Sequence, residues 1–401
     1  MLALCLVGTA ERALIHFRMH WIGLLVLANF AYWLITGFAS GGVGPGDLAS
    51  PAFFNNDGRV FLYYLPLLFF ACAQASDQDL HRAARAVVYI VGTSLALMVV
   101  WALTSLSWLS VGGQNWYGGL LTSHTGAGTF FGVLAVWLFV YGDVMRAPNL
   151  RLLGLLGAVP MFATGSRQAL VSLAAVLVWY VLRIGRGIVI VRTAVVAVIL
   201  TAMLSVAVPK LVERTAVIFS PQTFSAVVDI ASRAKWEPSV LEPLGGVESN
   251  ILSRIVLWKY AVRRFSESPV LGVGFARYND PGLRLQTAGV ASLAVRGDRA
   301  TNVYNAHNMY LHLLAESGVV GLCLLLAVWV GLWREMRRGE RELPTPLRAY
   351  YLACQAALVF TAVSASFDNA LAAPSVGLPV LALTGLALAR GRTSTPWRAL
   401  P

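Results

Sequence analysis

The sequence predicts an all-α, polytopic integral membrane protein with about ten transmembrane helices and one large external helical loop. Hydrophobic residues make up 57% of the 401-residue chain and charged residues only 12%, whereas soluble domains carry roughly 25% charged residues. Apolar stretches long enough to cross a bilayer recur along the chain, and one polar segment, 209–306, interrupts them. We therefore expect the polar chemistry to lie at one membrane face.

Ten apolar stretches are candidates for membrane-spanning helices. Several are short or contain Gly or Pro, which membrane helices tolerate where neighbours satisfy the backbone. They cover residues 20–38, 60–75, 87–108, 126–143, 150–163, 168–182, 187–208, 308–333, 348–367 and 374–390. Residues 1–208 are then expected to hold helices one to seven, 209–306 the external loop, and 307–401 helices eight to ten with a cytoplasmic tail, all in one membrane domain.

The arginines of the short loops predict the orientation. With both termini in the cytoplasm, only Arg59 and Arg167 fall in short loops on the opposite side. Short cytoplasmic loops are rich in Lys and Arg, and long loops are exempt from this rule. The large loop is then periplasmic in a bacterial inner membrane. The net charge of +12 is mostly this topology signal and implies no nucleic-acid partner.

Motifs for metal, nucleotide or serine-hydrolase chemistry are absent from the sequence. The loop 209–306 has no Asp-x-Asp pair, and the one such pair, Asp77 and Asp79, is cytoplasmic in this topology. The chain has no Walker loop, zinc motif or Gly-x-Ser-x-Gly elbow. Its four cysteines lie in or beside apolar stretches, so we expect no disulfide. We expect neither a metal nor another cofactor.

Within the loop, residues 251–265 have the pattern of an amphipathic helix. Asn250 or Ser253 is a candidate cap, and turns at Pro269, Gly272 and Gly274 follow. The apolar stripe consists of Ile251, Ile255, Trp258, Val262 and Phe265, and the basic residues are Lys259, Arg263 and Arg264. Such a helix suits a membrane surface, with its cations toward lipid headgroups, or packing against other helices.

Arg167 lies in a turn between two short apolar stretches. About 14 helical residues span ~21 Å against a hydrocarbon core of ~30 Å, so the turn is expected below the outer surface. A guanidinium at that depth costs several kcal/mol unless it meets water or an anion. The pattern indicates an anion-binding arginine in an outward-open cavity, and the alternative is an arginine that reaches the interface.

Arg254 and His307 are the other candidate site residues. Arg254 lies near the start of the loop helix, where a guanidinium fork and helix amides suit phosphate oxygens; a surface arginine is the simpler alternative. His307 ends the loop, where a neutral imidazole can act as a general base, or can serve only structure.

Further polar residues are candidates for supporting roles on the same side. Asn308 directly follows His307, while Arg59 and His124 begin helices there. Glu316 can pair with a histidine four residues earlier and is expected to support its helix rather than react. Asp368 also falls on this side.

Three stretches together resemble the bacterial O-antigen ligase and O-antigen polymerase superfamily. They are residues 164–167, residues 254–258 followed by 265–274, and residues 307–322. The third is quite specific, and the order of all three is more so. The chain departs from the family in having about ten helices, fewer than the family's ligases.

The resemblance implies a GT-C-like membrane glycosyltransferase that takes a glycan from undecaprenyl diphosphate. Ligases pass the glycan to a sugar of lipid A–core, and polymerases pass it to another lipid-linked repeat. Arg167 and Arg254 match the family's diphosphate-binding arginines, and His307 matches its essential histidine. We favour a metal-independent, inverting ligase. A polymerase, a lipid-linked saccharide transporter and a non-catalytic membrane scaffold stay open as alternatives.

Overall fold

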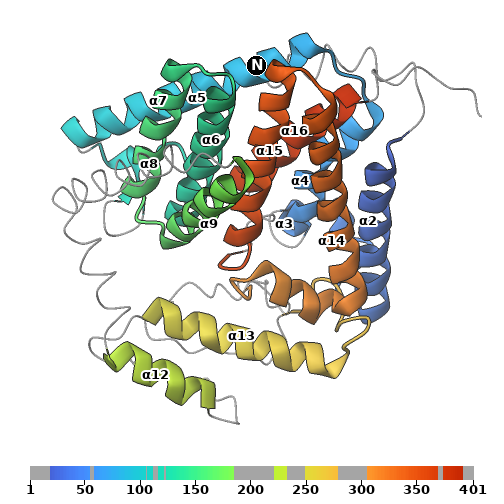
Figure 1. Ribbon diagram of the computed structural model, residues 1–401. Helices are drawn as coiled ribbons and strands as arrows, with labels where there is room; N and C mark the ends of the chain where they lie inside the picture. Colours follow the sequence, from blue (N-terminus) through green and yellow to red (C-terminus); the bar gives the residue numbers. More distant parts are fainter. Residues whose placement is uncertain are drawn as a thin grey trace, which may run out of the picture.

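The computed structural model describes residues 19–54, 58–104, 106–111, 116–121, 123–184, 221–232, 249–278, 305–368 and 374–391. These residues are almost entirely helical, apart from a small hairpin of β1 (Ser110–Val111) and β2 (Trp116–Tyr117) and two 3-10 turns (Figure 1). The α-helices are α2 (Trp21–Ser40), α3 (Pro51–Phe54), α4 (Arg59–Cys72), α5 (Asp77–Thr104), α6 (His124–Val144), α7 (Pro148–Leu156), α8 (Ala158–Ala163), α9 (Arg167–Ile184), α12 (Pro221–Ser232), α13 (Ser249–Glu267), α14 (Met309–Glu342), α15 (Thr345–Ser364) and α16 (Pro374–Gly391).

Five of these helices are long and apolar enough to cross a membrane, namely α2, α5, α6, α14 and α15. Shorter apolar helices occupy Arg59–Cys72, Pro148–Ala163 and Val376–Arg390. Large apolar side chains face outward from the bundle, with Leu103 81% and Leu182 80% exposed. The all-helical fold is therefore confirmed, and the long apolar helices fit a polytopic membrane protein. The count of about ten membrane-spanning helices stays a prediction, and the stretch 187–208 lies outside the described residues.

Two predicted spans differ in their boundaries from the observed helices. Helix α5 begins at Asp77 rather than near residue 87. The apolar pattern missed its first turn because that turn is polar. Asp79 accepts hydrogen bonds from Ser76 and so stabilises the start of the helix. The stretch 150–163 forms two helices, α7 and α8, instead of one. Pro160 cannot donate a backbone hydrogen bond to the preceding turn, which accounts for the break near Gly157.

The bundle has one arginine-rich end. There Arg183 pairs with Glu340 at 2.6 Å, Arg151 with Asp143 at 3.3 Å and Arg390 with Asp77 at 2.7 Å. Glu340 and Asp143 are buried. The three pairs join α9 to α14, α7 to α6 and α16 to α5 at this end. Helices α12 and α13 lie across the opposite end (Figure 1), which we call the α13 end.

Helix α14 is bent sharply at Gly318, which has φ 61° and ψ −166°. The bend leaves backbone groups without helical partners, and a loop after α13, residues 269–274, supplies them. The Val273 and Gly274 amides donate to the carbonyls of Ala315 and Glu316, both at 2.9 Å, and Val319 donates to Pro269 at 2.9 Å. Residues 308–333 are thus not one straight span. A short limb, 309–317, precedes the bend.

Glycine is required on both sides of this contact. Gly272 has φ 79°, and a Cβ there would lie 2.2 Å from the Glu316 carbonyl oxygen. A Cβ on Gly318 would lie 2.2 Å from the Val270 carbonyl oxygen. The Tyr32 hydroxyl of α2 donates to the Ser317 carbonyl at 2.9 Å, so α2 also holds the bend.

We predict that Gly272→Ala destabilises the protein by about 2–4 kcal/mol, because alanine meets both an unfavourable φ and a backbone clash. Thermal unfolding in detergent measures the effect. The matched control is Gly92→Ala in α5, where a Cβ would meet nothing within 4 Å. Alanine should be neutral or stabilising there by about 0.5–1 kcal/mol. Equal unfolding temperatures for the two variants would contradict the proposed role of the contact.

Candidate active site

The sequence-predicted residues gather at the α13 end of the bundle. Helix α9 begins there with Arg167, and the α14 limb begins just after His307. Arg59 and His124 are the first residues of α4 and α6, which start at the same end. Asp368 lies a few residues beyond the end of α15.

The turn that carries Arg167 is fixed against α6. Gly165 has φ 66°, and the Thr164 hydroxyl donates to the Met161 carbonyl at 2.6 Å. A Cβ on Gly128 of α6 would lie only 2.3 Å from the Ser166 Cβ, so glycine lets the turn sit directly on that helix. Arg167 itself is half-buried.

Helix α9 is longer than the predicted depth of Arg167 requires. That depth follows from about 14 helical residues beside the turn, yet α9 has 18 residues. At 1.5 Å per residue this helix is ~27 Å long, close to the thickness of the hydrocarbon core. Helix length therefore does not place Arg167 below the surface, and the observation that remains is its half-buried side chain next to a turn that packs on α6.

Asp368 connects His307 to the Arg167 turn. Its Oδ1 lies 3.4 Å from His307 Nδ1, and its Oδ2 accepts a hydrogen bond from Gln168 Nε2 at 3.3 Å. Gln168 directly follows Arg167 and is anchored a second time, because its Nε2 donates to Thr129 of α6 at 3.2 Å. This bridge brings His307 and Arg167, two of the three predicted residues, into one constellation.

His307 adopts an uncommon backbone conformation. Its φ of 44° lies in the left-handed region, which residues other than glycine adopt only when their surroundings hold them there. The His307 amide donates to Asn305 Oδ1 at 2.7 Å, and Asn308 caps α14 by accepting from the Leu311 amide at 3.1 Å. Asn308 therefore supports the site as an N-cap. The imidazole remains 43% exposed.

The His307 side chain is arranged for proton transfer. When Nδ1 carries its proton toward Asp368, the lone pair of Nε2 can accept another proton from a bound group. A carboxylate in this position fixes the tautomer and stabilises the imidazolium that forms. This is the chemistry of a general base.

Arg254 belongs to α13 and continues its buried face. That face consists of Leu257, Tyr260, Ala261 and Arg264. It packs against Ala306, Leu311 and Ala315, at the start of the α14 limb and within it. The loop 269–274 ties the end of α13 to the end of the limb, so both helices run toward the same anchored point. Arg254 and His307 each lie toward the other, N-terminal end.

Three details of the predicted loop helix were wrong. The helix begins at Ser249, so Asn250 and Ser253 lie inside it rather than capping it. Val262, from the predicted apolar stripe, is 51% exposed. Arg264, expected among the headgroup-facing cations, is buried, pairs with Glu267 and donates to the Arg277 carbonyl at 2.9 Å. Contact with the α14 limb, not the stripe, decides which face turns inward.

Glu316 joins α13 to the α14 limb. It is 1% exposed, its Oε1 accepts from the Tyr278 amide at 3.0 Å, and its Oε2 lies 3.5 Å from His312 Nε2. The Tyr278 hydroxyl donates in turn to the Leu257 carbonyl of α13 at 2.9 Å. Burial raises the pKa of Tyr278, so the phenol stays protonated as this donor requires. These contacts fit the supporting role predicted for Glu316.

Two residues of the bridge between Arg167 and His307, Gln168 and Thr129, were not predicted from the sequence. Both are polar residues in apolar helices, and this contrast is the signal by which they could have been found. Within the described ranges, no group of three or more His, Cys, Asp or Glu side chains could hold a metal ion.

The fold and the site define a class of protein. It is a helical membrane protein that carries arginine and histidine side chains at one end of its bundle. Residues 152–326 match the family model described as O-antigen ligase. The predicted resemblance is thereby confirmed over this segment, which contains Arg167, Arg254 and His307. The family comprises membrane enzymes of the O-antigen ligase and polymerase kind. A search of curated proteins found no match.

We predict that Glu316→Ala destabilises the contact between α13 and α14 by about 2–4 kcal/mol. The substitution leaves a buried Tyr278 amide without its acceptor and creates a small cavity. Hydrogen exchange of residues 269–278 should become faster, as measured by mass spectrometry. Glu316→Gln is the matched control, since its amide oxygen can still accept from Tyr278, and it should lose less than half as much. Unchanged exchange in Glu316→Ala would contradict this role.

Proposed function

We propose that this protein is a metal-independent, inverting glycosyltransferase of the O-antigen ligase type. It would transfer a glycan from undecaprenyl diphosphate to a sugar of lipid A–core at the periplasmic face. The observation that carries the proposal is the bridge from His307 through Asp368 to Gln168, beside Arg167. That bridge unites a candidate base and a candidate anion-binding group inside the segment that matches the family.

The separation of the two bundle ends supports the orientation. The arginine pairs that join α7 to α6 and α9 to α14 lie at one end, and the candidate site lies at the other. Arginines of short loops favour the cytoplasm, so the candidate site would face the periplasm. The polar segment 209–306, to which α12 and α13 belong, would then be the periplasmic loop, and both termini would be cytoplasmic.

The arginines would act on the leaving group. As the bond between the anomeric carbon and the phosphate oxygen breaks, negative charge grows on the lipid diphosphate. Arg167 and Arg254, approaching from the bundle and from α13, would bind that charge more strongly in the transition state than in the bound substrate. This difference lowers the barrier. Undecaprenyl diphosphate departs as the anion.

His307 would act on the acceptor. The acceptor oxygen forms its bond to the anomeric carbon from the face opposite the diphosphate, so the configuration inverts. The hydroxyl proton passes to His307 Nε2, and Asp368 stabilises the resulting imidazolium. All atoms are then accounted for without a metal or a nucleotide sugar.

We predict that Arg167→Ala and Arg254→Ala each lower glycan transfer on the order of 10²–10³-fold, the usual loss for one group that stabilises transition-state charge. His307→Ala should lower glycan transfer on the order of 10²–10⁴-fold. Purified protein in vesicles with a lipid-linked glycan and lipid A–core measures transfer. Arg263→Ala is the matched control, because Arg263 lies exposed on the same helix as Arg254 and should transfer normally.

The same assay separates the two acceptors. A ligase transfers to lipid A–core, whereas transfer only between two lipid-linked units would identify a polymerase. Wild-type transfer retained in His307→Ala would refute the mechanism. Translocation of the lipid-linked glycan without any transfer would favour a transporter instead.

Asp368→Asn should reduce turnover on the order of 10–100-fold while changing the donor KM little, because Asp368 orients a catalytic group rather than binding substrate. Separate kcat and KM values in the transfer assay check this. Asp47→Asn is the control, since Asp47 is a carboxylate just beyond the end of α2 that accepts a hydrogen bond from the Gly44 amide. A large rise in KM with unchanged kcat would instead make Asp368 a substrate-binding residue.

A further inference from the structure

Gln168 is a buried polar side chain between two parts of the candidate site. It is the second residue of α9, directly after Arg167, and it is 5% exposed. Its amide nitrogen donates to Asp368 Oδ2 at 3.3 Å and to Thr129 Oγ1 of α6 at 3.2 Å. A single side chain thus connects the bundle to the carboxylate whose other oxygen lies 3.4 Å from His307 Nδ1.

The neighbours of Gln168 fix the direction of its amide. An ionised carboxylate can only accept hydrogen bonds, so the NH2 group of the amide must face Asp368. The Thr129 hydroxyl donates its one proton to the Thr125 carbonyl at 2.9 Å, so it too accepts from Gln168. Both N–H groups are therefore engaged, and a flipped amide would lose both hydrogen bonds.

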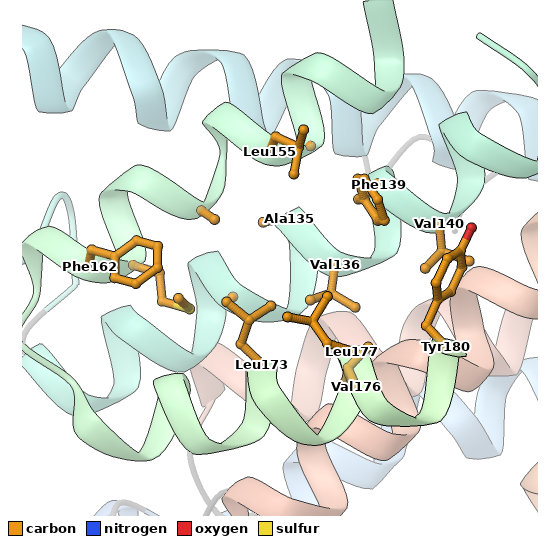
Figure 2. A pocket seen from close by; sticks show the side chains of 14 residues that line it. Ala135, Val136, Phe139, Val140, Leu155, Phe162, Leu173, Val176, Leu177 and Tyr180 are labelled. Atoms are coloured by element: carbon orange, nitrogen blue, oxygen red, sulfur yellow. The ribbon is translucent and has the colours of Figure 1, made fainter. Parts of the chain in front are cut away.

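The next turns of α9 place apolar side chains toward α6. Leu173, Val176 and Leu177 line one small apolar space together with Val136 of α6 (Figure 2). Apolar side chains offer no alternative hydrogen-bond partner. Turning the Gln168 amide away from its two acceptors would therefore leave buried N–H groups unpaired, which is unfavourable. The packing of the helix and the pairing of the amide hold this side chain in one position.

We propose that Gln168 is a positioning residue for glycan transfer, which holds Asp368 in the orientation that His307 requires. This inference rests on the proposed function. Gln168 would act through Asp368 rather than on the substrate. By engaging one carboxylate oxygen it leaves the other directed at His307, and it does so from the helix that begins with Arg167. The base and the anion-binding group would thereby keep the same spacing through each turnover.

Gln355 gives a matched comparison at the arginine-rich end. It is fully buried in α15, and its amide nitrogen donates to the buried Glu340 of α14 at 2.9 Å. Both glutamines therefore link their own helix to a carboxylate of another segment. The carboxylate at Gln168 faces His307, whereas the one at Gln355 pairs with Arg183. Substitution of either glutamine should lower stability, but a positioning role predicts lower transfer for Gln168 alone.

The experiment compares Gln168→Leu with Gln355→Leu in vesicles that contain a lipid-linked glycan and lipid A–core. The kcat and the donor KM are measured per folded molecule. Gln168→Leu should lower kcat on the order of 10–100-fold with little change in KM, the usual loss when a catalytic group loses the partner that orients it. Gln355→Leu should keep the wild-type kcat. A wild-type kcat in Gln168→Leu would overturn the inference.

A double-mutant cycle tests whether Gln168 acts through Asp368. In an Asp368→Ala background, Gln168→Leu should lower kcat by less than about threefold, because the carboxylate that it positions is already absent. Losses that multiply in the double variant would show that Gln168 acts elsewhere, and the inference would then be wrong. No transfer by the wild-type protein would instead refute the proposed function itself, which is a different result.

Thr129→Val tests the same contacts even if Gln168→Leu fails to fold. Valine has nearly the shape of threonine but lacks the hydroxyl that accepts from Gln168. Loss of this one hydrogen bond should lower kcat roughly three- to tenfold. The matched control is Thr384→Val in α16, since Thr384 is also fully buried and donates to a carbonyl four residues earlier, that of Val380. Equal kcat values in the two threonine variants would contradict the inference.

Discussion

The contact between the bent α14 and the loop after α13 is the constraint on which the α13 end depends. A helix that stops its hydrogen-bond ladder inside a packed protein leaves amides and carbonyls exposed, at a cost of about 1–3 kcal/mol each. Residues 269–274 satisfy these groups in pairs. Because the pairing is reciprocal, neither the bend nor the position of α13 is stable without the other.

This constraint explains how residues far apart in the chain meet. The limb 309–317 turns away from the membrane-spanning part of α14 and begins beside His307. Helix α13 packs along the same limb and carries Arg254. The bundle contributes Arg167 through a turn seated on α6, and Asp368 completes the bridge. The candidate site is thus built from two layers that share one anchoring point.

The sequence predicted the features that depend on local pattern. Apolar runs predicted the helices, and the positions of Arg167 and His307 at helix starts follow from where those runs begin. It did not predict the bend at Gly318. The positive φ there breaks the helical hydrogen bonds of α14 and is favourable only because the loop 269–274 supplies new partners. Arg264 turned inward for a similar reason, since Glu267 pairs with its charge and the Arg277 carbonyl accepts one of its hydrogen bonds. The role of Asp368 depends on contacts across 61 and 200 residues of chain, which no local pattern encodes.

The left-handed backbone of His307, with φ 44°, has a consequence for how that position can change. Glycine adopts this conformation at the least steric cost, so a glycine there would remove the imidazole while the backbone keeps its path into α14. The backbone geometry and the side-chain chemistry of this position are therefore separable.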